Sequence, residues 1–301
     1  MKISVVIRAL NEEKYLGELL LSISRQQLGD MHVETILIDS GSTDETLRIA
    51  EENGCRVTHI QKHEFTFGRS LNWGSKLANG DILVYISGHC VPESSSWLTE
   101  LVGPIRDGTA SYTYGRQVGR DTTTYSEKKI FEKYYSEKSK IPQAGFFCNN
   151  ANSAIAKSTW EKYQFDEDVT GLEDMELAKR LVNDGNVIAY VAEAVVFHIH
   201  RESFAQTKRR YERESIALQH IMPEIHISFL DMLRYFSAAV RSDFSDAMSE
   251  ARFLSELGGI VKFRFAQYWG TYRGNHEHRK LSRERKENYY YPSKIFGDSD
   301  K

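Results

Sequence analysis

The 301-residue chain has little cysteine and little proline, with three Cys and five Pro. Cys55, Cys90 and Cys148 lie far apart and form no C-x-x-C pair, which argues against a disulfide framework and against a structural zinc site. Three scattered thiols instead fit a reducing compartment. With 41% hydrophobic residues and so few prolines, the composition indicates a globular chain and argues against a collagen-like or low-complexity one.

A long hydrophobic run is also missing. No apolar stretch reaches the roughly 20 residues that a membrane-spanning helix needs. The apolar residues 3–7 are followed at once by Arg8, whereas a signal peptide needs a longer apolar region and a small-residue cleavage site. We therefore expect residues 3–7 to form the first strand of a cytoplasmic protein, with peripheral attachment to the inner face of the plasma membrane as the alternative.

The chain lacks a strong charge of either sign, since 39 Lys and Arg balance 42 Asp and Glu. This argues against a nucleic-acid partner, because binding duplex DNA usually needs a strongly basic surface. The exception is local: residues 262–294 hold nine Lys or Arg against three Glu, interleaved with aromatic side chains. Such a segment fits docking to an anionic membrane surface, a helical subdomain packed on the rest of the chain, or a homodimer contact.

Two nucleotide-binding motifs are absent as well, since the chain has neither a G-x-G-x-x-G turn after its first strand nor a P-loop. What is present is an alternation of elements: strands are predicted at 3–7, 33–38, 57–60 and 82–86, and helices at 12–26, 42–53 and 71–77. A capping box formed by Ser42 and Glu45 is expected to open the second helix. This order predicts an α/β fold with a mostly parallel sheet flanked by helices.

Polar residues follow three of these strands at the points where the strands end. They are Arg8 and Asn11 after the first strand, Asp39, Ser40 and Ser42 after the second, and Ser87, Gly88 and His89 after the fourth. Ordinary turn chemistry would explain any one of these loops. Because ligands bind beyond the carboxyl ends of parallel strands, the three loops together predict a ligand site at this edge of the sheet.

Six segments, in a fixed order, carry a resemblance to a known family: residues 5–13, 38–46, 67–74, 149–155, 171–177 and 197–200. Over residues 3–215 the chain resembles family 2 of the inverting, nucleotide-sugar-dependent glycosyltransferases, which have the Rossmann-like GT-A fold. The nearest pattern is that of bacterial rhamnosyltransferase-like enzymes that build surface polysaccharides such as capsule and lipopolysaccharide. The resemblance implies transfer of a sugar, with inversion, from a nucleotide-sugar donor to a glycan or lipid-linked acceptor.

The resemblance also implies a division of the chain. Residues 1–203 would form the GT-A catalytic domain, with the nucleotide-sugar half at 1–115 and the acceptor half at 116–203. Residues 204–301 would form a helical, basic and aromatic C-terminal segment, because residues 204–257 have a helical pattern and the basic run follows. If this segment docks on the anionic cytoplasmic leaflet, it would bring the enzyme to lipid-linked acceptors.

For the donor, the resemblance implies contacts from Arg8, Asn11, Glu12, Asp39, Ser40, Arg69, Asn72, Ser87 and Gly88. Asp39 would accept hydrogen bonds from the base, and Asn72 would support the loop of Arg69. The guanidinium of Arg69 would bind the diphosphate, since its fork geometry matches phosphate oxygens. Without the resemblance, an ordinary surface salt bridge is the simpler interpretation of Arg69.

For the acceptor side, the family pattern implies Asp174 as the general base, which takes the proton of the acceptor hydroxyl. Glu173 would orient the base or bind an acceptor hydroxyl, and a helix N-terminus at this point would keep both carboxylates ionised. Asn149, Asn150 and Asn152 would contact the acceptor sugar, because amides suit arrays of hydroxyls. Alternatively, these amides complete an irregular strand.

The metal motif departs from the family pattern, which usually has Asp-x-Asp where this chain has Ser87-Gly-His89. His89 and His200, with His198 as the alternate, would then hold a divalent metal. Imidazole ligands favour Mn, Co or Zn over Mg, which prefers oxygen, so we expect Mn more than Mg. The opposite interpretation is a metal-independent site in which His89 or Arg69 is the cation near the phosphates.

Two rival functions remain from the sequence. The substituted metal motif suits a catalytically inactive relative that binds nucleotide or glycan as a partner subunit, although Glu173 and Asp174 argue for an enzyme. A nucleotidyltransferase that makes nucleotide sugars would need a Gly-rich basic loop after the first strand, and residues 9–12 do not supply one.

Overall fold

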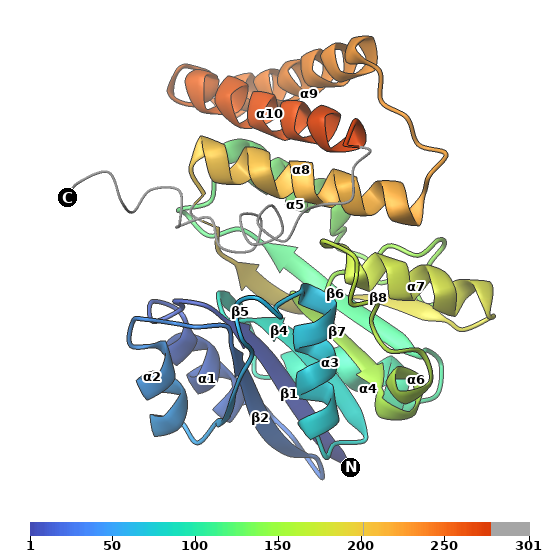
Figure 1. Cartoon of the computed structure of the whole chain (residues 1–301). Helices are drawn as coiled ribbons and strands as arrows, with labels where there is room; N and C mark the ends of the chain where they lie inside the picture. Colours follow the sequence, from blue (N-terminus) through green and yellow to red (C-terminus); the bar gives the residue numbers. More distant parts are fainter. Residues whose placement is uncertain (201, 278–301) are drawn as a thin grey trace. The chain divides into compact units, whose positions relative to one another are not determined.

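A computed structural model describes residues 1–200 and 202–277 (Figure 1). These residues divide into two compact units. Unit 1 comprises residues 1–121, 131–168 and 173–199, and unit 2 comprises residues 122–130 and 169–172 together with the chain from residue 200 onward. We describe each unit by itself.

Unit 1 is built on an eight-stranded sheet with the strand order β3-β2-β1-β4-β7-β6-β8-β5. The strands are β1 (Lys2–Ala9), β2 (His32–Asp39), β3 (Arg56–His59), β4 (Ile82–Ser87), β5 (Cys90–Pro92), β6 (Tyr112–Val118), β7 (Asn152–Ala156) and β8 (Ile188–His198). The first four are parallel to one another, whereas β7 runs antiparallel to both β4 and β6. β8 is parallel to β6, and the short β5 pairs antiparallel with β8.

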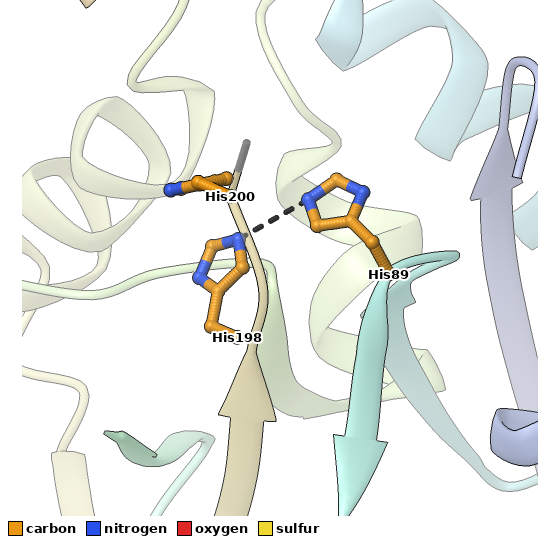
Figure 2. A group of neighbouring side chains, drawn as sticks. All are labelled: His89, His198 and His200. Carbon is orange, nitrogen blue, oxygen red and sulfur yellow. Dashed lines mark hydrogen bonds between the residues drawn. The ribbon is translucent and has the colours of Figure 1, made fainter. Parts of the chain in front are cut away.

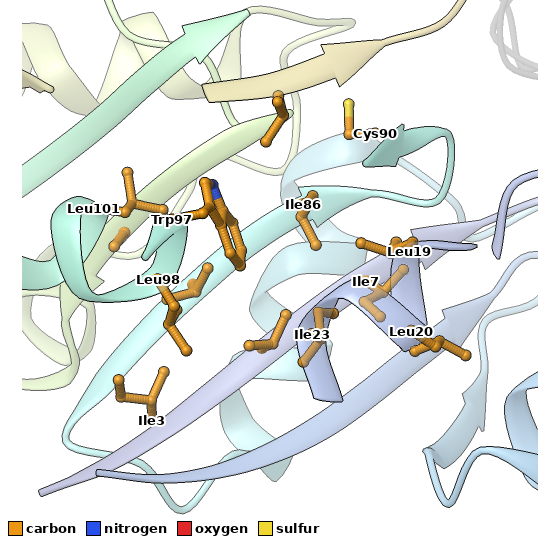
Figure 3. Close-up of a cluster of buried hydrophobic side chains, with 14 of the residues drawn as sticks. Ile3, Ile7, Leu19, Leu20, Ile23, Ile86, Cys90, Trp97, Leu98 and Leu101 are labelled. Atoms are coloured by element: carbon orange, nitrogen blue, oxygen red, sulfur yellow. The ribbon is translucent and has the colours of Figure 1, made fainter. Parts of the chain in front are cut away.

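Helices cover both faces of this sheet. They are α1 (Leu16–Ser24), α2 (Thr46–Glu52), α3 (Phe67–Leu77), α4 (Trp97–Arg106), α6 (Lys157–Tyr163) and α7 (Glu173–Asn183). Because side chains of a strand alternate between faces, Ile3, Val5 and Ile7 of β1 join one core while Val6 joins the other. Figure 3 shows the first core, in which apolar side chains of α1 and α4 meet those of β1 and β4. The predicted α/β sheet flanked by helices is confirmed.

Besides α1, which begins at Leu16 rather than at residue 12, two of the predicted helix starts differ from the structure. α2 begins at Thr46, without a side-chain cap, so the capping box expected from Ser42 and Glu45 is wrong. Ser42 Oγ instead accepts the main-chain N–H of Asn11 at 2.9 Å, and Asn11 Oδ1 accepts the N–H of Thr43 at 2.8 Å. The two loops that follow β1 and β2 therefore satisfy each other, and this cross-loop pairing replaces the local cap.

The other difference lies in α3, which begins at Phe67, four residues before the predicted start. The hydroxyl of Thr66 accepts the N–H of Arg69, so it caps the first turn of this helix. Gly68 allows the close approach that follows, because a Cβ at this position would lie 2.1 Å from the carbonyl oxygen of Asp166. The first turn of α3 is thus fixed by contacts that periodicity does not reveal.

Unit 2 contains three long helices, α8 (Phe204–Ile221), α9 (Phe229–Ser249) and α10 (Phe253–Asn275), and the first residues of α5 (Tyr125–Tyr134). The predicted helical C-terminal region is therefore confirmed as far as residue 277. α10 packs closely on α8, since a Cβ at Gly270 would lie 2.2 Å from the carbonyl oxygen of Lys208. Among residues 1–200 and 202–277, no helix combines the length and apolarity needed to cross a membrane.

The basic and aromatic segment predicted at 262–294 lies inside the described residues only up to 277. In this part Lys262 and Arg273 are exposed, but Arg264 is buried in a bidentate ion pair with Asp243, with N–O distances of 2.7 Å. The segment is therefore not a uniformly solvated basic face. Its remaining residues lie outside the described chain.

Candidate active site

The ends of three neighbouring strands bring polar residues to one edge of the sheet. In the pairing of β1 with β2, Ala9 lies opposite Asp39, and in the pairing of β1 with β4, Arg8 lies opposite Ser87. The convergence predicted from the sequence is thus confirmed. It follows from the parallel register, because the carboxyl ends of the strands share an edge.

Asp39 is buried and both of its carboxylate oxygens are occupied. Oδ2 accepts the N–H of Gly41 and Oδ1 accepts the N–H of Ser42, each at 2.9 Å, and His59 Nδ1 lies 3.2 Å from Oδ2. Ser40, also buried, donates its main-chain N–H to the carbonyl of Ala9. The carboxylate therefore anchors the loop after β2 in a fixed turn.

Arg8 links β1 to the start of α7, 165 residues later in the chain. Its Nη1 lies 3.1 Å from Glu173 Oε1, and its guanidinium carbon lies 4.9 Å from the ring centroid of Phe67. A guanidinium on an aromatic face keeps its charge while little of it is hydrated. Sequence analysis assigned Arg8 to the donor and gave Phe67 no role of its own. No local pattern indicates that Arg8 or Phe67 lies near Glu173, which is far away in the sequence.

Arg69 and Asn72 hold α3 to residues 165–167. Arg69 Nε contacts Glu167 Oε2 at 2.7 Å, which is the salt bridge considered for it, and its Nη1 donates to the carbonyl of Glu64. The buried Asn72 donates to Glu167 Oε1 at 3.0 Å and to the carbonyl of Phe165 at 2.9 Å. In this structure both side chains therefore support the loop that carries Glu167.

Glu173 and Asp174 are the first two residues of α7, and both are buried. Asp174 Oδ2 accepts the main-chain N–H of Asn150 at 2.8 Å, and Oδ1 accepts that of Met175 at 2.8 Å. Burial first, and the neighbouring carboxylate of Glu173 second, raise the pKa of Asp174 to about 7. Desolvation thus opposes the ionisation of Asp174 that the helix N-terminus was expected to favour, and it outweighs the two N–H donors.

The three asparagines assigned to the acceptor differ in exposure. Asn149 is half-buried, whereas Asn150 and Asn152 are buried. Asn152 accepts Trp97 Nε1 at 2.9 Å and donates to the carbonyl of Ala194 at 2.8 Å, so its amide is occupied inside the sheet. For Asn150 and Asn152 the structure favours the alternative, an internal strand framework, over contact with an acceptor.

A pair of histidines lies where β5 and β8 meet, since Cys90 pairs with His198. Figure 2 shows the rings of His89 and His198 facing each other, with 3.2 Å between their Nε2 atoms. Glu12 Oε1 lies 2.7 Å from His89 Nδ1, and Gln117 Oε1 lies 2.6 Å from His198 Nδ1. Both oxygens are acceptors, which favours the tautomers with a proton on each Nδ1, and the two Nε2 atoms converge within hydrogen-bond distance.

Two converging imidazole lone pairs, each backed by a hydrogen-bonded oxygen, suit a shared cation. A ligating histidine commonly donates its other N–H to a carboxylate or carbonyl, as His89 does to Glu12. Gly88 permits this contact, because a Cβ there would lie 2.8 Å from Glu12 Cγ. The donor set fits a divalent transition metal, and Glu12, which was expected to line the nucleoside pocket, orients His89.

His200 belongs to unit 2, where its Nδ1 lies 2.8 Å from Glu127 Oε1. Arg210 Nη2 contacts the same oxygen at 2.9 Å. Burial opposes the charged form of Glu127, but the hydrogen bond from His200 and the charges of His200 and Arg210 lower its pKa. The thiol of Cys90, beside His89, is buried, and burial raises its pKa, which disfavours it as a thiolate ligand.

Comparison with known proteins identifies related sequences. A family model described as Glycosyl transferase family 2 matches residues 4–162. The O-antigen chain rhamnosyltransferase RfbN of Salmonella typhimurium is 25% identical over 294 residues, which cover 92% of this chain and 90% of the relative. The O-antigen chain rhamnosyltransferase WbaN of Salmonella anatum is 30% identical over 189 residues, which cover 59% of this chain and 60% of the relative.

Solved structures share the fold at low sequence identity. The mannosyltransferase PcManGT of Pyrobaculum calidifontis, in complex with GDP-Man and Mn2+, has a TM-score of 0.60 at 17% identity and covers 91% of this chain and 84% of its own. S. aureus TarS 1–349, in complex with UDP, has a TM-score of 0.53 at 16% identity and covers 93% of each chain. These likenesses confirm the GT-A type of fold that the sequence resemblance implied.

Proposed function

Because this chain belongs to glycosyl transferase family 2, we propose that it moves a sugar from a nucleotide-sugar donor to a glycan or lipid-linked acceptor in bacterial surface polysaccharide synthesis. The observation that carries the proposal is Asp174, a buried carboxylate whose pKa is about 7. A general base works best when its pKa is close to the working pH. The rhamnosyltransferase relatives support a polysaccharide product and a sugar of that class.

The reaction is a single displacement with inversion. Asp174 takes the proton of the acceptor hydroxyl while that oxygen forms a bond to the anomeric carbon, and the bond from this carbon to the donor phosphate breaks. The negative charge leaves on the nucleoside diphosphate and must be stabilised by cations. Glu173 stays paired with Arg8, so its charge discourages ionisation of Asp174 until the pH approaches neutrality.

The donor is proposed to lie at the ends of β1, β2 and β4. The residues assigned to it remain Arg8, Asn11, Glu12, Asp39, Ser40, Arg69, Asn72, Ser87 and Gly88, of which Glu12 and Asn72 would act by holding neighbours in place. The neighbours solved with UDP and with GDP-Man support a nucleotide site on this fold. Asn149, the half-buried member of its group, is proposed to face the acceptor.

His89 and His198 are proposed to hold a divalent metal, with His200, two residues further along the chain, as an additional ligand. Bound there, the ion would supply positive charge to the leaving diphosphate. We propose Mn over Mg, because Mg, which selects oxygen ligands, tolerates imidazole nitrogen less well than a transition metal does. The solved neighbour with GDP-Man and Mn2+ supports this choice.

A first experiment tests which nucleotide the donor carries, whether binding needs a metal, and whether the protein is an inactive relative. Calorimetric titration with UDP, GDP, dTDP and CMP, each with Mn, Mg or EDTA, is expected to show one nucleotide that binds and needs Mn. His89→Ala should weaken Mn binding at least tenfold by EPR, whereas His63→Ala, which changes an exposed histidine, should not. If a nucleotide bound equally well in EDTA, a cationic side chain of the protein would take the place proposed for the metal. If no nucleotide bound at all, the inactive-relative function would be favoured.

The base is tested by Asp174→Asn. We expect nucleotide affinity to stay within about twofold while transfer falls about 10²–10⁴-fold, the range for loss of a general base. Glu176→Gln on the same helix is the matched control, since Glu176 pairs with Arg180. Near-wild-type transfer by Asp174→Asn would overturn the assignment.

The division into a catalytic domain at 1–203 and a helical segment at 204–301 is kept as a proposal, together with docking of that segment to an anionic membrane surface. Large apolar side chains exposed on α9 and α10, among them Leu230 and Leu254, support a contact surface there. Flotation with anionic vesicles should carry the full chain upward, and Leu230→Ser with Leu254→Ser should abolish this. Flotation by the double variant would exclude these two leucines as the membrane contact, whereas dimers in light scattering without flotation would favour a second copy of the chain instead.

A further inference from the structure

The side chain of Asn150 lies between the two carboxyl groups of α7 and two buried hydroxyls. Its Nδ2 donates to Glu173 Oε1 at 3.3 Å, while its Oδ1 accepts Tyr112 Oη at 2.5 Å and Ser153 Oγ at 2.8 Å. Its main-chain N–H donates to Asp174 Oδ2 at 2.8 Å. One buried residue thus gives one hydrogen bond to each carboxyl group.

The two hydroxyls fix the orientation of this amide. An asparagine side chain has one acceptor end and one donor end. Tyr112 and Ser153 both donate to Oδ1, so Nδ2 must face Glu173; the reversed amide would place its oxygen against that carboxylate. An amide held in this way keeps a donor on Glu173 without any rearrangement.

The two carboxyl groups consequently have different surroundings. Glu173 Oε1 receives the guanidinium of Arg8 at 3.1 Å as well as the amide of Asn150. Asp174 receives main-chain N–H groups, from Asn150 and Met175. Side-chain donors that include a cation stabilise a negative charge more than neutral main-chain donors do, so the surroundings favour a negative charge on Glu173 over one on Asp174.

We propose that Asn150 is a positioning residue for the base: it donates to Glu173 beside Arg8 and holds the carboxyl of Asp174, so that the pair binds its proton on Asp174. This rests on the proposed role of Asp174 as the base. The titratable and charged groups that act on Asp174 are Glu173 on its own helix, Arg8 on β1, Tyr112 on β6, Tyr135 after α5 and Cys148 before Asn150. Burial raises the pKa of Tyr112, Tyr135 and Cys148, so these three stay neutral near pH 7.

The main-chain N–H of residue 150 provides a direct readout, because it donates to Asp174 and its proton chemical shift follows the ionisation of that carboxyl. In the wild type we expect this amide to titrate with a midpoint near pH 7. Tyr112→Phe removes one of the two donors that hold the amide and should raise the midpoint by about 0.5 pH unit, a threefold lower ionised fraction at pH 6. Asn150→Asp removes the donor and adds a charge beside Glu173, and should raise it by about one unit or more.

The matched control is Tyr85→Phe. Tyr85 is as fully buried as Tyr112, but its hydroxyl pairs with Ser75 Oγ at 2.8 Å. This variant should lower the melting temperature without moving the titration of residue 150. In Tyr112→Phe the acid limb of the transfer rate should move with the amide, while nucleotide affinity stays unchanged.

The inference is overturned if Tyr112→Phe loses stability as Tyr85→Phe does and leaves both the amide titration and the acid limb at their wild-type positions. If Asn150→Asp fails to fold, the Tyr112→Phe variant still tests the role proposed for Asn150. The two proposals fail separately: transfer retained by Asp174→Asn would refute the base, whereas the amide titration tests Asn150 without any transfer assay.

Discussion

Buried carboxyl groups occur in both units, but their hydrogen-bond and charge partners differ. In unit 2, Asp243 forms a bidentate pair with Arg264 and also accepts Ser126 Oγ, and Glu127 meets both His200 and Arg210. In unit 1, Asp174 is buried beside another carboxylate, with main-chain N–H donors, and its pKa is raised to about 7. A buried acid that is paired with an arginine contributes to the structural framework. A buried acid without its own arginine partner binds a proton more readily.

The same change, Asp to Asn, should therefore have opposite effects on stability in the two units. The larger effect is expected for Asp243→Asn, which leaves Arg264 buried without a counter-charge and should lower the free energy of unfolding by about 3–5 kcal/mol in urea denaturation. Asp246→Asn, which changes a half-exposed carboxylate of the same helix, should cost less than about 1 kcal/mol. Equal losses for the two variants would remove the distinction between buried and exposed acids.

Asp174→Asn should instead stabilise the protein above neutral pH. The native pKa is raised to about 7 from an unfolded value near 4, so the protonated carboxyl stabilises the native state fully below pH 4, and this is lost as the pH rises through 7. Three pKa units correspond to about 4 kcal/mol. We subtract the free-energy cost of leaving the Met175 N–H without an acceptor, and expect a gain of about 1–3 kcal/mol in the free energy of unfolding at pH 8. Thermal unfolding of both proteins at pH 8 and pH 4 measures this, and a gain of equal size at both pH values would contradict it.

The smallest effect concerns the pH dependence of the unmodified enzyme. If Asp174 is the base, transfer should fall about tenfold for each pH unit below about 7, that is, about 1.4 kcal/mol per unit. An acid limb near pH 4 would mean that Asp174 is stabilised as an ion, like the arginine-paired acids of unit 2. Measuring kcat/KM from pH 5 to pH 8 in a constant-ionic-strength buffer distinguishes the two.

Local patterns predicted the first four strands and the parallel half of the sheet well, because burial on both faces leaves continuous apolar runs such as residues 82–86. They failed where a residue has two uses. Ser42 has the residue type and spacing of a capping box, yet its hydroxyl serves Asn11, 31 residues earlier. A side chain that can hydrogen-bond to the backbone of a distant loop need not cap the helix next to it in the sequence.

The candidate site shows the same limit. The sequence resemblance named Glu173, Asp174, His89 and His198, but not which atoms they offer. Glu12 orients His89 across 77 residues, and Arg8 reaches Glu173 across 165. Asn150 and Asn152 could not be separated from Asn149 by sequence, since Asn152 is buried by its place in β7 and Asn150 is buried among contacts with Tyr112, Ser153 and α7.

The sequence by itself determined the order of strands and helices, the edge where polar loops gather, the family, and the departure from Asp-x-Asp at Ser87-Gly-His89. The tertiary structure decided the chemistry of those groups. Pairing of β5 with β8 set His89 and His198 ring to ring, and burial beside Glu173 gave Asp174 its pKa. The reason is that composition and periodicity report local burial, whereas proton affinity and ligand geometry depend on charges and donors that approach from distant parts of the chain.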